Sequence, residues 1–136
     1  MSCNSAIYVN NSTNTAVSTT AGTFVQVPFG SVVRRFGKAL ALDSGSIMAY
    51  GSGYFDIDGS LTVTPTAAGP ITVQIRKDGV PVQGITATAT GTAGSPTTLP
   101  LTGMIRNCGC NCNSALTLWV NAPCNITNAS IVVEKL

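Results

Sequence analysis

The cysteines carry the greatest capacity for chemistry in this sequence, because the chain contains no histidine. Three of the five fall in one run, Cys108-Gly109-Cys110-Asn111-Cys112, and the other two, Cys3 and Cys124, lie near the two ends. Structural zinc sites usually take their ligands from two Cys pairs with two to four intervening residues, or from His. The run is therefore a poor match to a zinc site, even if Cys3 or Cys124 completed a four-thiolate set.

Disulfide bonding is the interpretation that the cysteine spacing favours, ahead of free thiols and of metal ligation. A Cys-x-Cys pair cannot easily bridge to itself without strain, so each cysteine of the run needs a partner elsewhere. Cys3 and Cys124 are the remaining thiols, and an odd total leaves at least one thiol free or bonded to another chain. Cys3, close to the N-terminus, suits a bond between subunits.

Catalytic chemistry is not indicated by the remaining side chains. A Cys, Ser or Thr nucleophile normally needs an activating base such as His, which is absent. Asp56 and Asp58 share one strand face, but nothing near them in sequence supplies an acid, a cleft or a positive partner. The same stretch lacks the further oxygen ligands and the closing Glu of a calcium loop. We therefore predict a protein that is not an enzyme and holds no cofactor and no metal.

The densest basic group is formed by Arg34, Arg35 and Lys38. It has two interpretations: docking on an acidic neighbour such as a capsid surface, or ordinary edge packing. Adjacent strand residues face opposite ways, so one Arg would point outward while the other covers an apolar edge with its stem. This alternation favours edge packing. Seven basic against five acidic residues give a net charge of +2, too little for an electrostatic nucleic-acid binder.

The location of the protein is addressed by hydropathy and by the N-terminus. No apolar stretch approaches the roughly 18 to 20 residues that cross a bilayer, so no membrane association is predicted. The segment from Met1 to Ala6 has neither the basic nor the apolar region of a secretory signal, which indicates synthesis in the cytoplasm. Only 9% of residues are charged, a composition better tolerated in an assembled particle than in a concentrated free monomer.

The elements that would position these residues are short β-strands with period-two alternation. Phe55, Ile57, Leu61 and Val63 share one parity, and similar alternation marks the segments 71–76, 116–120 and 129–133. Other expected strands cover residues 6–10, 23–27, 32–36, 39–42, 47–50, 82–90 and 99–105. The Asp78-Gly79 pair predicts a two-residue type I′ turn that joins the segments 71–77 and 80–85.

About eight to ten strands in 136 residues, with no helical period longer than two turns, predict one all-β domain. We expect a single-domain antiparallel β-sandwich of jelly-roll type over residues 1–136, preceded by a short N-terminal arm at about residues 1–5.

Several stretches carry a resemblance to known proteins. Together they resemble small proteins encoded in prophages and tailed phages of gut Firmicutes, over nearly the whole chain; the stretches are residues 31–37, 53–58, 73–80, the cysteine run and 128–136. The Gly53-Tyr54-Phe55 strand, followed by two strands joined through Lys77-Asp78-Gly79, is similar to the C1q/TNF-like jelly roll, whose members form compact trimers.

The resemblance implies a virion surface protein: a homotrimeric head decoration or head-fibre subunit, with the major capsid protein as a second partner. The chain departs from fibre proteins in having neither a collagen-like stem nor a long fibre segment.

Two other functions remain open on the sequence. One is a disulfide-linked spore or cell-surface filament subunit, for which disulfide bonds within or between chains would be expected as well. A glycan-binding module would need aromatic residues in its loops, but the loops 68–70, 91–96 and 109–113 contain none. Trp119 and Tyr54 could line a carbohydrate patch, although 6% aromatic residues more simply pack a core or an interface.

Overall fold

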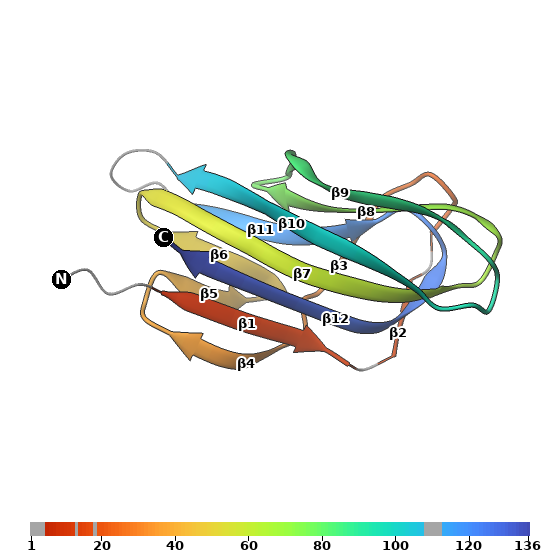
Figure 1. The fold of residues 1–136 in the computed structure, drawn as a ribbon, viewed down its shortest axis with the longest axis horizontal. Coiled ribbons are helices and arrows are strands. Elements are labelled where there is room, and N and C mark those ends of the chain that lie inside the picture. Colours follow the sequence, from red (N-terminus) through yellow and green to blue (C-terminus); the bar gives the residue numbers. More distant parts are fainter. Residues whose placement is uncertain (1–4, 13, 18, 108–112) are drawn as a thin grey trace.

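The computed structural model describes residues 5–12, 14–17, 19–107 and 113–136 as two antiparallel six-stranded sheets packed face to face (Figure 1). The described residues form strands and turns but no helix, and so none of these segments has the long apolar helix that spans a bilayer. The strands are β1 (Ala6–Asn11), β2 (Thr15–Val17), β3 (Val25–Val27), β4 (Ser31–Phe36), β5 (Leu40–Asp43), β6 (Ser46–Tyr50), β7 (Gly53–Pro65), β8 (Gly69–Lys77), β9 (Val80–Gly91), β10 (Thr97–Asn107), β11 (Asn113–Val120) and β12 (Cys124–Lys135).

The chain crosses repeatedly between the two sheets. Sheet A has the order β10-β7-β12-β1-β4, with β2 paired to β12. Sheet B has the order β5-β6-β11-β8-β9, with β3 paired to β11. From β6 onward the chain changes sheet at every connection except the β8–β9 hairpin. This connectivity is that of a closed sandwich in which both sheets contribute one face to a shared core.

Alternation along the strands builds that core. Phe55, Ile57, Leu61 and Val63 of β7 are fully buried between the sheets, whereas the neighbouring Asp56 is exposed. Buried residues from most of the other strands, among them β1, β8, β10, β11 and β12, complete the interior. The parity that the sequence predicts for β7 is confirmed, and so is the all-β sandwich.

The β8–β9 turn has the predicted geometry. Asp78 and Gly79 both adopt positive φ, at 53° and 84°, and Lys77 pairs with Val80. Positive φ at both central residues is the mark of a type I′ turn, which matches the twist of the flanking strands. Ser44 and Gly45 repeat this geometry, with φ of 50° and 80°, between β5 and β6.

Most strands are longer and the strands are more numerous than alternation predicts, although β3 covers only Val25–Val27 of the expected segment 23–27. Strand β2 is not indicated by the sequence, because the surrounding segment 10–20 consists largely of Asn, Ser and Thr without an apolar period. The N-terminal arm falls outside the described residues except for Ser5, which is buried. The carbonyl of Ser5 accepts a hydrogen bond from the Lys135 N–H at 2.7 Å, and its hydroxyl accepts one from the Ala39 N–H at 3.2 Å.

An irregularity in β9 shapes the edge of the sandwich. Arg76 of β8 pairs with Pro81, but the next pair along β8 joins Gln74 to Thr86, so four residues of β9 bulge out of the ladder. The bulge carries Ile85 over β10, where a Cβ built on Gly103 would lie 2.4 Å from Ile85 Cγ1. Only glycine fits at position 103 beneath that side chain.

Candidate functional site

The most apolar exposed surface of the described residues lies on the strands of sheet A. Of the nine large hydrophobic residues that are exposed, six belong to β4, β7, β10 and β12: Val32, Val33, Phe36, Tyr54, Met104 and Val132. By contrast, the outward positions of β8 and β9 in sheet B carry mainly Thr, Gln and Arg. Exposed apolar side chains gathered on one sheet are typical of surfaces that contact other proteins.

The register of sheet A brings apolar and charged side chains together in rows across neighbouring strands. One row runs Arg34, Tyr8, Val132, Asp58, and the adjacent row runs Phe36, Ala6, Glu134, Asp56, Met104. We call the outward surface formed by these nine residues the sheet A face. Three of the five acidic residues of the chain gather on its two central strands, and Arg34 lies on its outer strand.

The sheet A face is hollowed between its outer strands. A depression of about 310 Å³ lies beside β1 and β4 and is lined in part by Tyr8, Arg34, Phe36 and Val132. Phe36 is 61% exposed on the rim of the face. An apolar hollow beside a protruding aromatic ring is a shape that a second protein surface can fill.

The basic cluster is divided by the fold. Arg34 lies opposite Tyr8 on the sheet A face, whereas Arg35 donates a hydrogen bond from Nε to the Leu40 carbonyl at 2.6 Å. Lys38 is exposed in the bend between β4 and β5. Adjacent arginines on one strand thus have different neighbours, and the fold does not gather the three cations into one patch. Docking by Arg34, Arg35 and Lys38 remains a prediction.

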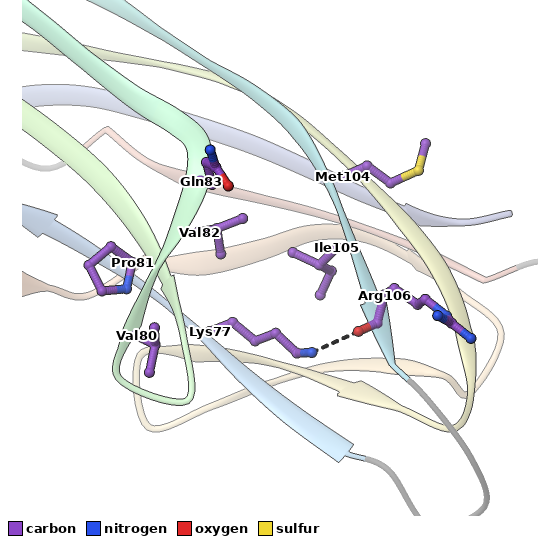
Figure 2. Close-up of a pocket in the computed structure, with 8 residues that line it drawn as sticks. All are labelled: Lys77, Val80, Pro81, Val82, Gln83, Met104, Ile105 and Arg106. Carbon is purple, nitrogen blue, oxygen red and sulfur yellow. Dashed lines mark hydrogen bonds between the residues drawn. The ribbon is translucent and has the colours of Figure 1, made fainter.

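An edge groove opens where the β8–β9 hairpin leaves β10 (Figure 2). Its volume is about 330 Å³, and Val82 and Ile105 lie between the two strands. Lys77 reaches across and donates a hydrogen bond from Nζ to the Arg106 carbonyl at 2.7 Å. We define the edge groove by Lys77, Val80, Pro81, Val82, Gln83, Met104, Ile105 and Arg106.

The edge groove also exposes the backbone of a strand edge. Because the Arg106 carbonyl points to Lys77, it points away from β7, and by alternation the backbone groups of Met104 face the same way. The groove therefore combines an apolar floor, the Lys77 ammonium group and a strand edge, whereas the Arg106 side chain points away from the groove and lies over Tyr54 (Figure 2). The sequence signal that could have indicated it is Pro81 and Gly84 within a strand-like run, since both residues favour bulges and edges.

Cys124 is the cysteine that the structure describes, and it is a core residue. It is 1% exposed at the start of β12, where it pairs with Val17 and Pro65, and its thiol is free. Desolvation by burial raises the pKa of the Cys124 thiol from 9.0 to about 11. The other four predicted thiols, Cys3, Cys108, Cys110 and Cys112, lie outside the described residues.

The fold places Cys124 far from the points where the other cysteines join the described chain. Cys124 pairs with Pro65 at one end of β7, whereas Asn107 pairs with Gly53 at the other end, roughly 40 Å away at about 3.3 Å per residue. Ser5 lies at the same end of β7 as Gly53, because its carbonyl accepts a hydrogen bond from Lys135, which pairs with Phe55. A disulfide needs Cα atoms within about 7 Å, so we expect Cys124 to remain a thiol.

The buried thiol predicts a specific pH dependence of stability. Its pKa is higher in the folded chain than in the unfolded chain, so the stabilisation is complete below pH 9 and is lost as the pH rises towards 11. A difference of about two units between the pKa values of the folded and unfolded chain corresponds to roughly 2 to 3 kcal/mol of folding free energy. In urea unfolding under reducing conditions, the native chain should lose this much more stability between pH 9 and 11 than a Cys124→Ala variant. Parallel pH curves for the two proteins would contradict the assignment.

Other predicted residues are separated by the fold. Tyr54 lies on sheet A beneath Arg106, whose guanidinium is 5.8 Å from the ring centre, whereas Trp119 lies on sheet B. They do not form one carbohydrate patch. Asp56 and Asp58 both point outward from β7, and the described residues hold no group of three or more His, Cys, Asp or Glu arranged to bind a metal ion.

Comparison with known proteins identifies the fold. No family model matches the chain, and no curated protein matches it. Among solved structures, murine APRIL at pH 8.0 superposes with a TM-score of 0.74 at 9% identity, covering 98% of this chain and 99% of APRIL. The globular domain of zebrafish complement 1qA gives a TM-score of 0.64 at 7% identity, covering 96% and 95% of the two chains. PRD1 vertex protein P5 gives 0.61 at 14% identity, covering 96% of this chain and 72% of P5. At these identities the likeness establishes a C1q/TNF-like jelly roll and nothing further.

Proposed function

We propose that this protein is a non-enzymatic structural subunit of a phage particle, a head decoration or head-fibre protein that assembles with copies of itself. The observation that carries the proposal is the sheet A face, where exposed Phe36, Met104 and Val132 accompany charges of both signs. A surface of this composition is costly to leave in water and has the mixed character of a protein–protein interface.

The edge groove supplies a complementary surface for the same assembly. It bears Lys77, while the centre of the sheet A face bears Asp56, Asp58 and Glu134. Contact between the groove side of one copy and the sheet A face of the next joins unlike charges and buries apolar groups on both sides. The two surfaces share only Met104, so the contact is heterologous, and we propose that it closes into a ring of three.

Virion location is supported by the fold and by the resemblance of the sequence to phage proteins. A vertex protein, P5 of PRD1, shares the jelly roll. Of the predicted docking residues, Arg35 and Lys38 at the β4 edge are candidates for docking on an acidic surface of the major capsid protein, whereas Arg34 belongs to the sheet A face that the next copy covers. A spore or cell-surface filament subunit is the alternative, and open-ended assembly in place of ring closure would distinguish it.

The particle itself tests this function. Density-purified particles from a producing culture, digested and quantified by mass spectrometry, should contain this chain in a fixed ratio to the major capsid protein. The ratio should persist through a high-salt wash in which loosely adsorbed host proteins decline. If the chain is absent from purified particles and present in the soluble lysate, the phage-particle function is wrong.

A further inference from the structure

An arginine with a fixed orientation lies on the outward face of sheet B, on the side of the molecule opposite the sheet A face. The guanidinium carbon of Arg76 is 4.1 Å from the ring centre of Trp119 and 5.2 Å from that of Phe24. Its Nε donates a hydrogen bond to Gln74 Oε1 at 2.7 Å, and Gln74 is only 7% exposed. Two aromatic rings and a buried amide therefore determine how the guanidinium lies.

The aromatic partner of Arg76 is itself held in place. The indole Nε1 of Trp119 donates a hydrogen bond to Thr117 Oγ1 at 2.7 Å. Trp119 and Gln74 are directly opposite each other on β11 and β8, which are neighbours in sheet B (Figure 1). Side chains locked by neighbours lose little entropy when a ligand binds, so the group is organised before any contact is made.

The side chain of Arg76 makes its hydrogen bond through Nε, to Gln74. Within the described residues its two terminal nitrogens have no acceptor. Nor does a carboxylate neutralise it. Asp78, two residues along, accepts a hydrogen bond from the Ala115 N–H at 2.9 Å, and Asp43 ends β5. The three other acidic residues belong to sheet A. The planar donor pair that matches a carboxylate in two-point geometry is thus unused.

The surroundings of Arg76 are polar and uncharged. Gln26 lies opposite Trp119, Thr86 lies opposite Gln74, and the hydroxyls of Thr72 and Thr88 are 3.0 Å apart on the same face. Amide and hydroxyl groups beside aromatic rings suit a hydroxyl-rich ligand better than an extended peptide, which would need side-chain pockets.

We propose that Arg76, flanked by Phe24 and Trp119, binds the carboxylate of an acidic saccharide of the sialic or uronic acid type. Both terminal nitrogens of Arg76 donate to the carboxylate, and the neighbouring amides and hydroxyls meet the hydroxyls of the sugar. This face is opposite the sheet A face but borders the edge groove, because Arg76 pairs with Pro81. The sugar site and the particle function stand or fall separately.

Trp119 is the one tryptophan of the chain and reports directly on the site. Titration with N-acetylneuraminic acid and with glucuronic acid should change its fluorescence saturably and shift its indole N–H resonance. The methyl ester of each sugar, which lacks the carboxylate charge, should bind at least tenfold more weakly. Arg76→Gln should weaken binding of the acids at least tenfold, and Arg76→Lys, which keeps the charge without the planar pair, should also weaken it.

The matched control is Lys135→Gln, which removes a cation from β12 of sheet A and should leave the affinity unchanged. The indole resonance serves as readout if Arg76→Gln alters the fluorescence itself, and Arg76→Lys serves if the Gln variant does not fold. Absence of saturable change with either acid overturns the proposal. Equal binding of acid and methyl ester overturns the role of the carboxylate, and equal binding of inorganic sulfate overturns the assignment to a sugar.

Discussion

A Val132→Arg variant is expected to be monomeric at concentrations where the native chain is a trimer. Val132 is 38% exposed and lies between Tyr8 and Asp58 in the register of sheet A. In the isolated chain the new guanidinium faces Asp58, so folding should be unaffected. In the assembly it would lie against the edge groove of the next copy, where Lys77 carries the same charge, and like charges that face each other across an interface destabilise it. We expect the dissociation constant to rise at least 100-fold, about 2.7 kcal/mol.

Sedimentation velocity over a dilution series measures this change. The control is Thr86→Arg, which places the same side chain at an exposed position of sheet B. Both variants should retain the native melting temperature of the protomer, and Thr86→Arg should sediment as the native chain does. A Val132→Arg protein that remains trimeric with native affinity would remove the sheet A face from the assembly.

The second large effect is expected at Gly103, where β10 passes beneath the bulge of β9. A Cβ at this position would lie 2.4 Å from Ile85 Cγ1 and 2.8 Å from Ile85 Cδ1, and Ile85 is fully buried. Gly103→Val should therefore lower the free energy of unfolding by about 1 to 3 kcal/mol or more, because neither strand can move without opening the core. Urea unfolding at neutral pH measures the loss.

A double-mutant cycle identifies the cause of that loss. Ile85→Ala alone should cost roughly 2 to 5 kcal/mol through the cavity that it leaves. Val at position 103 should fill part of that cavity, so the double variant should be more stable than the sum of the two single effects requires. Thr102→Val, at the adjacent outward-facing position, controls for strand propensity and should change stability little. Additive effects would show that Ile85 and residue 103 do not compete for space.

Local patterns in the chain predict much of the fold. The alternation of Phe55, Ile57, Leu61 and Val63 identifies the buried face of β7, because a strand with one face in a core repeats every two residues. The Asp78-Gly79 pair identifies a hairpin, because few residue pairs accept positive φ at both positions. Strand β2 escapes such patterns because its stabilisation comes from pairing with β12, more than 100 residues away, and not from its own composition.

The candidate surfaces are harder to predict than the strands. Alternation indicates that Phe36 and Met104 can point outward, but only strand order places them in the same row of one sheet. The edge groove depends on a bulge at Gly84, and the Arg76 site depends on the pairing of β8 with β11. These are long-range properties, and a single sequence contains the residues without their register.

The mass of the native chain in solution tests self-assembly through the sheet A face most directly. Light scattering coupled to size exclusion, at high micromolar concentration and with reducing agent present to exclude disulfide-linked species, should give the mass of three 13.9 kDa chains, about 42 kDa. Dilution should yield the monomer without a persistent dimer. A constant mass of 13.9 kDa at every concentration would contradict the account.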